Sequence, residues 1–291
     1  MDDFSGVVLY QLFPQWDLPA LQKILESLES DVHVDVQDGP GSGEVVVRIG
    51  KATGVLIPAE GPMPEEMAIA SLGMADIPES DRKYLVNHGA HVQVLCDENH
   101  GVAPIEKMIF LVKIGMALCY EEGLALCIPA SGNCLIGRKL NDLQAMNSKG
   151  PRAWGIDDSE AALVPYEQHT LWNSLRHEGQ PAELLVGFVP AEIDGRTWFI
   201  SAGHSLFGMP EIVYYDGDIH DFHSAREYFR YFFRRYFSNP GRMVAGESIQ
   251  VSDTTVFALE PMPDKYHEFQ ASTGTLLVKL IESPLQEKDW N

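Results

Sequence analysis

Residues 184–237 read LLVGFVPAEIDGRTWFISAGHSLFGMPEIVYYDGDIHDFHSAREYFRYFFRRYF and carry the strongest local structural signals of the chain. Asp194-Gly195 separates two apolar segments, and this dipeptide favours a two-residue hairpin because both turn positions require positive φ. A corner bounded by glycines at 203 and 208 leads to a further strand at 211–215. An aromatic, arginine-rich helix is expected at 225–237. The stretch therefore predicts a sheet of at least three strands with a helix packed on it.

The first 145 residues show alternating strand and helix patterns. These expected elements lie at 7–13, 18–28, 32–36, 44–49, 78–88 and 90–96. Residues 104–122 are apolar nearly all round a helix, which predicts a long buried helix. The continuous apolar segment 124–130 is typical of an interior strand with both faces covered. We therefore expect an N-terminal α/β lobe.

Together these patterns predict an α+β fold in two packed lobes with mixed or antiparallel sheets. The expected N-terminal lobe covers 1–145, and the expected C-terminal α+β lobe covers 181–283. Residues 146–180 have no clear period but contain large apolar anchors, which indicates a packed connector. The last segment, 284–291, is expected to be a flexible tail.

The formal net charge of −21 at pH 7 is the most unusual property of the composition. Such a charge repels phosphate backbones and argues against nucleic-acid binding, whereas it suits a basic protein partner. The N-terminus lacks the basic residues of a secretion signal, and charges interrupt the longest apolar segment, so we expect no membrane span. The four cysteines form no CxxC pair and are expected to be reduced, mostly buried thiols of a cytoplasmic protein.

Several segments occur in an order that suggests a family. They are NHGAHVQV at 87–94, the apolar helix with its following strand, FISAGHSLFGMPEI at 199–212 and AGESIQVSD at 245–253. In these segments, over roughly residues 5–281, the chain resembles the bacterial domain-of-unknown-function family DUF4261. The resemblance implies a cytosolic bacterial protein and assigns neither a catalytic activity nor functional residues. The acidic, aromatic segment 214–223 and the arginines after it are not expected of every member.

The corner after the second strand contains Gly203, His204, Phe207, Gly208 and Glu211. Its sequence is close to the G-x-S-x-G elbow of hydrolases, but Phe207 stands at the last glycine position and a strand follows instead of a helix. We interpret the corner as structural. Its glycines would supply backbone angles that other residues resist, and Glu211 would accept hydrogen bonds from the corner.

An acidic, histidine-containing loop is the metal candidate of the chain. Alternate residues of an extended segment point to one side, so Asp216, Asp218 and His220 could meet a divalent cation together with His223. The same residues are also explained without a metal, as a solvated loop with favourable negative charge before a helix N-terminus. No cofactor is expected unless this loop binds a metal.

The arginines of the expected helix are the binding candidate. Arg226, Arg230 and Arg234 recur at every fourth position and form one stripe, with Arg235 beside it. In an acidic protein these guanidinium groups pair either with the protein's own carboxylates or with an acidic group of another molecule. Arginine and aromatic residues are favoured at interface centres, so these four arginines and Tyr231 are the predicted binding residues.

Three further features have both a chemical and a structural interpretation. His88 and His91 could ligate a metal, although helix-end and strand histidines are more often structural. Cys134 could be a thiolate nucleophile because it follows the buried strand, but no base occurs at a recognisable spacing. The glycine-rich loop 38–43 lacks the ending of a phosphate loop and precedes a strand, so we interpret it as a hairpin loop.

The function we expect is a non-enzymatic protein–protein interaction module of immunity or regulatory type. It would use its acidic surface and the arginine-rich aromatic helix. One alternative is a metal-dependent or thiol enzyme built on residues 216–223 or on Cys134, and another is a structural subunit of a larger assembly. The sequence leaves the partner and the oligomeric state open.

Overall fold

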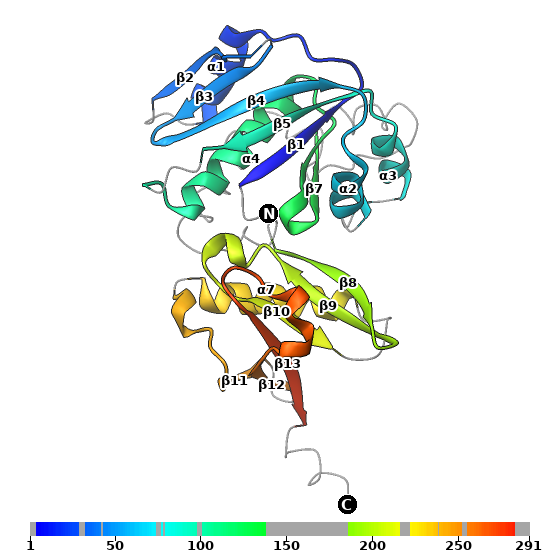
Figure 1. Cartoon of the computed structure of the whole chain (residues 1–291). Coiled ribbons are helices and arrows are strands. Elements are labelled where there is room, and N and C mark those ends of the chain that lie inside the picture. The colour runs from blue at the N-terminus through cyan, green and yellow to red at the C-terminus, as the bar shows by residue number, and fades with distance from the viewer. Residues whose placement is uncertain are drawn as a thin grey trace, which may run out of the picture. The chain divides into compact units, whose positions relative to one another are not determined.

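The computed structural model describes residues 4–28, 33–41, 43–73, 77, 79–97, 101–137, 186–215, 222–237, 239–251 and 255–282. The chain divides into two compact units, Asp3–Pro181 and Ala182–Asn291. Each unit combines helices with a β-sheet, which confirms the α+β fold class (Figure 1). The connector expected at 146–180 and the tail expected at 284–291 lie outside the described residues.

The first unit contains a seven-stranded sheet with the order β2-β3-β4-β5-β1-β6-β7. Its strands are β1 (Ser5–Tyr10), β2 (Val34–Asp38), β3 (Val45–Ile49), β4 (Ala52–Glu60), β5 (Ala90–Cys96), β6 (Ala125–Ile128) and β7 (Asn133–Ile136). All of its described pairings are antiparallel, which corrects the expected α/β lobe. The chain does run from strand β5 through helix α4 to strand β6, as the sequence predicted. However, β1 lies between these two strands and pairs antiparallel with both.

Helix α4 (Pro104–Glu121) is the long buried helix predicted from its all-round apolar pattern. It packs on strands β1, β4, β5 and β6, and α1 (Leu18–Leu28) packs against α4 and β2. A glycine makes the close approach possible, because a Cβ on Gly115 would lie only 2.4 Å from the side chain of Leu126 in β6. Because Gly115 has no side chain, the helix can pack directly against Leu126 of the sheet.

The opposite face of this sheet is covered by three short helical segments. They are α2 (Glu65–Ala68), the π-helical turn η1 (Ile69–Gly73) and α3 (Glu79–Val86). The buried residues that join them to the sheet are Val7, Leu9, Met63, Leu72, Leu85, Ala125, Cys127 and Cys134. Every residue of β6 is buried, which confirms the prediction of an interior strand covered on both faces.

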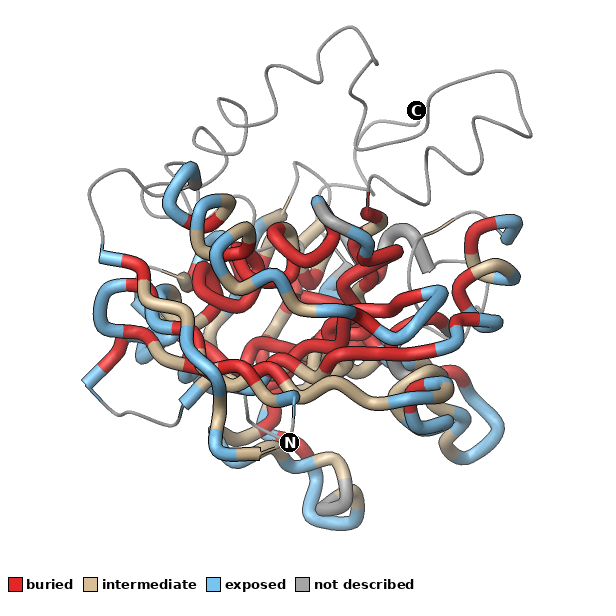
Figure 2. The backbone as a smooth tube through the Cα atoms, turned by 90° about the horizontal axis from the view of Figure 1, so that it is seen from above, coloured by how far each residue is buried: buried red, intermediate tan, exposed pale blue. Residues whose placement is uncertain are grey.

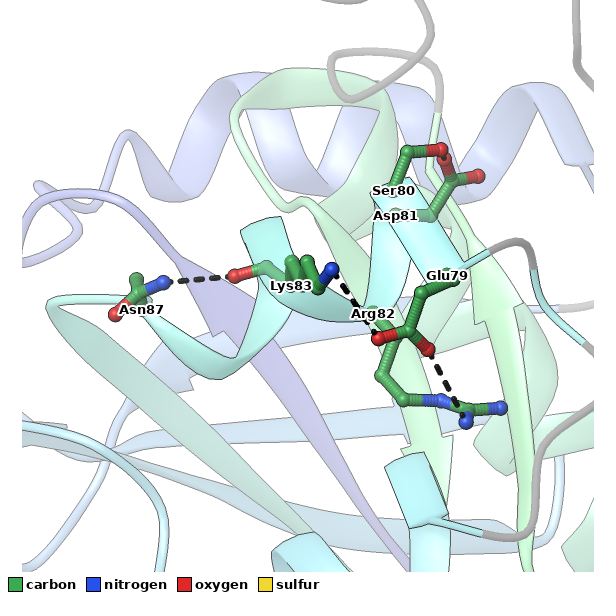
Figure 3. Close-up of polar contacts among 6 residues, drawn as sticks. All are labelled: Glu79, Ser80, Asp81, Arg82, Lys83 and Asn87. Atoms are coloured by element: carbon green, nitrogen blue, oxygen red, sulfur yellow. Dashed lines mark hydrogen bonds and ion pairs between the residues drawn. The ribbon is translucent and has the colours of Figure 1, made fainter.

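Helix α3 carries a set of polar contacts (Figure 3). Glu79 forms ion pairs of 3.6 Å with Arg82 and with Lys83. At the other end of the helix, Asn87 Nδ2 donates to the Lys83 carbonyl at 2.7 Å and so satisfies a carbonyl group of the last turn. Exposed pairs of this spacing stabilise a helix by only about 0.3–0.5 kcal/mol each. Leu85 of α3 is fully buried against the sheet, and its packing also holds the helix in place.

The second unit contains a six-stranded sheet with the order β11-β12-β13-β10-β9-β8. Its strands are β8 (Gly187–Ile193), β9 (Arg196–Ala202), β10 (Glu211–Tyr215), β11 (Ser248–Gln250), β12 (Thr255–Pro261) and β13 (Thr275–Glu282). Only β10 and β13 pair in parallel, so the sheet is mixed. Asp194 and Gly195 have φ of 52° and 71°, which confirms the predicted hairpin turn. Strand β8 tolerates Pro190 because an edge strand can lack one ladder hydrogen bond.

Helix α7 (Phe222–Tyr236) covers one face of this second sheet with aromatic side chains. The rings of Phe229 and Phe188 lie 5.9 Å apart, and those of Phe232 and Phe257 are separated by the same distance. Because Phe188 belongs to β8 and Phe257 to β12, the helix crosses most of the sheet. Aromatic pairs of this kind add about 0.5–1.5 kcal/mol beyond the burial of their area.

The other face of the second sheet is covered by the helical turn η7 (Asp264–Phe269). Trp198, Val213 and Met262 form its buried cluster, and the ring of Tyr266 in η7 contacts Trp198 edge to face, with 4.8 Å between the centroids. Figure 2 shows the central strands buried over much of their length and the connecting turns exposed. Among the helices that the structure describes, none has the length and the hydropathy needed to cross a membrane.

Candidate functional site

The corner between β9 and β10 is built by two glycines and a short 3₁₀ turn. Gly203 and Gly208 have φ of 104° and 72°, a region that residues with a Cβ rarely adopt. Between them η5 (Ser205–Phe207) turns the chain, and the Gly208 N–H closes the turn by donating to the Ser205 carbonyl at 3.0 Å. The buried ring of Phe207 meets Phe233 of α7 edge to face, with 5.1 Å between the ring centroids. The corner is thus fixed by backbone geometry and by contact with α7.

Glu211 holds this corner together. Its Oε1 atom accepts hydrogen bonds from the Gly203 N–H at 3.2 Å, the Ser205 N–H at 2.9 Å and the Ser205 hydroxyl at 2.8 Å. Its Oε2 atom accepts a short hydrogen bond from the Ser201 hydroxyl. The oxygen of Ser201 in turn accepts the Ile212 N–H at 2.8 Å. A carboxylate that is only 7% exposed is therefore bonded through both oxygens, as a buried charge requires.

His204 links the corner to α7. Its side chain is fully buried, with Nδ1 3.4 Å from the Ser201 hydroxyl oxygen and Nε2 3.4 Å from the Phe229 carbonyl oxygen. Burial lowers the pKa of His204, while the Glu211 carboxylate opposes this effect. Serine, histidine and glutamate are the residue types of a hydrolytic triad. Here, however, the Ser201 proton is donated to Glu211 and all three side chains are buried, so the arrangement is suited to a structural role.

The predicted binding residues on α7 divide between the core and the surface. Arg234 and Arg235 are exposed, whereas Arg230 is half-buried; the side chain of Arg226 lies outside the described residues. Tyr231 is half-buried, and its hydroxyl donates to the Gln250 carbonyl of the edge strand β11 at 3.0 Å. The residues that face the sheet are Ala225, Phe229, Phe232, Phe233 and Tyr236. The helix therefore buries an aromatic stripe and leaves arginines on its solvent side.

Part of this arginine cluster has an internal explanation. Arg234 and Arg235 lie in the last turn of α7, where positive charge is favoured by the helix dipole. Burial raises the pKa of Tyr236 to about 12; the nearby Glu247 carboxylate adds to this rise and Arg235 opposes it. Arg235 therefore lies close to the Tyr236 hydroxyl of its own helix. The helix begins at Phe222, three residues before the start expected from the sequence.

The metal candidate cannot be placed. Asp216, Asp218 and His220 lie outside the described residues, and so does the side chain of His223, which belongs to the first turn of α7. The metal site on this loop therefore stays a prediction. Within the ranges that the structure describes, no three histidine, cysteine or acidic side chains gather closely enough to hold a metal ion.

The ring nitrogens of His88 are both used in backbone hydrogen bonds. Nε2 accepts the Met63 N–H at 2.7 Å, which leaves the proton on Nδ1, and Nδ1 donates to the Leu85 carbonyl at 2.7 Å. Burial lowers the pKa of His88, which favours this neutral tautomer. The neighbouring His91 places Nδ1 3.0 Å from the Gly61 carbonyl oxygen. These histidines fasten the loop after β4 to the end of α3 and the start of β5.

Two further sequence candidates are resolved by their contacts. In the glycine-rich loop, the Gly41 N–H donates to the Glu44 carboxylate at 2.8 Å, so the loop presents a carboxylate where a phosphate loop would need free amides. It joins β2 to β3 as a hairpin, as predicted. The thiol of Cys134 accepts a hydrogen bond from the Cys127 thiol at 3.5 Å, and so its observed partner is a second cysteine.

Sequence reasoning missed two of these contributors. Ser201 had no signal of its own, because its role depends on β10 returning beside β9. Cys127 did have a signal: it lies seven residues before Cys134 across a turn at Pro129–Ser131 and Gly132, a spacing that permits a cross-strand pair. Sequence reasoning treated Cys127 as a buried thiol and did not pair it with Cys134.

Comparison with protein-family models, curated proteins and solved structures finds no match for this chain. The resemblance to DUF4261 therefore stays a prediction. Any functional conclusion has to come from the residues themselves.

Proposed function

We propose that this protein is a non-enzymatic binding module that recognises a partner protein through the solvent side of α7. The observation that carries the proposal is the exposure of Arg234 and Arg235 on the helix whose opposite side is buried against the sheet. Arg242, in the helical turn η6 (Pro240–Arg242) that follows α7, is exposed as well. Guanidinium groups of this kind form paired hydrogen bonds with carboxylates, so the expected contact is an acidic segment of the partner.

The rest of the chain restricts where such a segment can bind. The net charge of −21 repels an acidic partner from most of the surface, and a local group of arginines then determines both position and orientation. A rigid helix is a suitable platform, because α7 is fixed to its sheet by Phe229, Phe232 and Phe233. An immunity or regulatory role, which the sequence led us to expect, requires only stoichiometric binding of this kind.

The described catalytic candidates favour binding over chemistry. The proton of Ser201 and the oxygens of Glu211 are engaged in the corner, and both ring nitrogens of His88 are engaged with backbone groups. A nucleophile or base must reach substrate to act. These groups contact the protein itself, and their burial restricts access from solvent.

The test is a capture experiment with matched charge reversals. The double variant Arg234→Glu/Arg235→Glu removes the proposed contact while leaving the aromatic face intact. Its control is Lys51→Glu/Lys83→Glu, which makes the same change in net charge at exposed positions of the other unit. Both variants should retain the circular dichroism spectrum of the wild type.

We expect the wild type and the lysine control to capture the same stoichiometric partner and the arginine variant to lose it. Raising the salt concentration should also release the partner, because exposed charge pairs are screened. Equal capture by all three folded proteins would show that α7 is not the binding face. Absence of any stoichiometric partner for the wild type would remove the support for a binding module.

A further inference from the structure

Two buried cysteines face each other in the β6–β7 hairpin of the first unit. Cys127 and Cys134 are direct partners in the register of the two strands, and their sulfur atoms are 3.5 Å apart. The turn between them contains Gly132 with φ of 65°, which closes the short connection. Both side chains belong to the buried cluster under η1 and α3. We propose that this pair is a thiol–disulfide exchange site, which closes into a cross-strand disulfide when the protein meets a small-molecule disulfide.

The hydrogen-bond register places the pair at a position that can be bridged. The Gly137 N–H donates to the Leu124 carbonyl at 2.7 Å. In an antiparallel ladder, hydrogen-bonded and non-hydrogen-bonded pairs alternate, and Cys127 with Cys134 is therefore a non-hydrogen-bonded pair. Cα atoms in such a pair are about 4.5 Å apart. A disulfide spans Cα separations of about 4.4–6.8 Å, so the bond can form without a shift in strand register.

Burial and strand position assign different roles to the two sulfurs. Cys127 is fully buried, whereas Cys134 is 9% exposed, so an oxidant reaches the Cys134 sulfur first. The contact with Cys134, together with burial, raises the pKa of Cys127 well above its ordinary value. Cys134 also lies on β7, which is the last strand in the sheet order and pairs only with β6 among the described strands. Separation of this one strand pair therefore exposes the Cys134 sulfur. Cys134 is therefore the attacking thiol and Cys127 the resolving thiol.

The exchange proceeds in two steps, with oxidised glutathione as a representative of the small disulfides. Cys134 releases its proton to solvent and attacks one sulfur of the oxidant; the oxidant's S–S bond breaks, and one thiolate leaves and is protonated. Cys127 then loses its proton, attacks the Cys134 sulfur of the mixed disulfide and expels the second thiolate. The two cysteines lose two electrons in total, and the oxidant is reduced to two thiols.

The other two cysteines provide the internal controls. Cys96 lies on β5, and burial raises the pKa of its thiol to about 11. Cys119 lies on α4, and burial raises the pKa of its thiol far above the ordinary value. All four thiols are free in the structure. Selective pairing of Cys127 with Cys134 is thus a distinct outcome from general oxidation.

The test is incubation of the whole native chain with oxidised glutathione, followed by thiol counting and peptide mapping by mass spectrometry. We expect two of the four thiols to be lost and one linked peptide, Cys127 to Cys134, that reverts on reduction. The melting temperature of the oxidised protein should be higher, because the bond constrains the unfolded hairpin. The variant Cys96→Ser/Cys119→Ser should behave in the same way, whereas Cys134→Ser should form no internal bond.

Two results would overturn the proposal. One is the survival of all four thiols in the native protein under conditions that oxidise the same chain in urea. The other is a bond to Cys96 or Cys119, or separate glutathione adducts on Cys127 and Cys134. Unchanged circular dichroism spectra of Cys127→Ser and Cys134→Ser separate loss of the bond from loss of the fold.

Discussion

Glu211, His204 and His88 show how this protein accommodates buried polar side chains. Glu211 accepts four hydrogen bonds from the corner residues, and His88 engages both of its ring nitrogens with backbone groups. A buried polar group that lacks hydrogen-bond partners lowers the free energy of unfolding by about 1–3 kcal/mol. Each of these side chains therefore stabilises the fold only because its hydrogen bonds are formed. At the scale of the residue, then, the polar interior of the described chain holds segments of backbone together.

Replacing Glu211 with glutamine should destabilise the second unit. The amide would present an NH₂ group to donors that now meet a carboxylate oxygen, and at least one buried donor would be left without an acceptor. We expect the free energy of unfolding to fall by about 1–3 kcal/mol, measured by urea denaturation. The exposed Glu260→Gln, which loses only a surface ion pair with Lys279, should change it by less than about 1 kcal/mol. Equal effects of the two substitutions would contradict the role assigned to Glu211.

His88 should make stability depend on pH. Its pKa is lowered in the folded protein, whereas the unfolded chain takes up a proton near the ordinary value of about 6.5. Stability is therefore full above that value and falls as the pH drops below it, until the folded pKa is reached. Urea denaturation at pH 7.5 and pH 5.5 should show a smaller loss in His88→Gln than in the wild type, because the contribution of His88 is removed while that of His204, whose pKa is also lowered, remains. Exposed His33→Gln is the control, and identical losses in wild type and His88→Gln would refute the assignment.

At the scale of the element, α4 packs closely on the sheet of the first unit. Its residues Met108, Phe110, Ile114 and Leu118 are buried among β1, β4, β5 and β6. The close approach of helix and sheet depends on Gly115, which faces the buried Leu126. Protein interiors are packed as densely as organic crystals, so a single added carbon cannot be absorbed there without movement.

The substitution Gly115→Ala should therefore destabilise the first unit, although alanine is the better helix former. Overpacking of this kind costs about 1–3 kcal/mol, which exceeds the gain of at most about 1 kcal/mol from helix propensity. Gly241→Ala is the matched control, because its new Cβ would have its nearest neighbour at 4.0 Å. Unfolding in urea measures both. In a Leu126→Ala background the cost of Gly115→Ala should become smaller, and an unchanged cost would show that Leu126 is not the obstacle.

At the scale of the whole molecule, the net charge of −21 acts on every other interaction. Such a charge keeps a protein soluble but destabilises its compact state through repulsion among the acidic groups. Surface ion pairs such as Lys265 with Asp194 and Lys279 with Glu260, each at 3.6 Å, are worth only about 0–1 kcal/mol apiece and offset little of this repulsion.

Salt should therefore stabilise the protein. Raising the ionic strength from about 10 mM to about 150 mM shortens the Debye length from about 30 Å to about 8 Å and screens the repulsion. We expect the urea midpoint at pH 7 to rise with sodium chloride. A midpoint that falls over the same range would indicate that attractive surface pairs outweigh the repulsion. A neutral solute such as sucrose, used at equal osmolarity, is the control for effects unrelated to charge.

Local patterns predicted the elements whose causes are local. Asp194-Gly195 gave the hairpin because few other dipeptides adopt positive φ at both positions, and both do so here. The all-round apolar pattern of α4 predicted its burial, and the continuous apolar segment around β6 predicted a strand covered on both faces. The glycines at 203 and 208 likewise predicted the backbone of the corner.

The sequence by itself therefore determined the α+β class, the buried helix and the glycine turns, because periodicity and turn chemistry act over a few neighbouring residues. Tertiary structure alone decided that β1 separates β5 from β6, which makes the first sheet antiparallel. It also decided that Ser201 bonds to Glu211 and which arginines of α7 reach solvent. The first two depend on which strands become neighbours and the exposure of the arginines on which side of α7 packs on its sheet, and no local pattern encodes these choices.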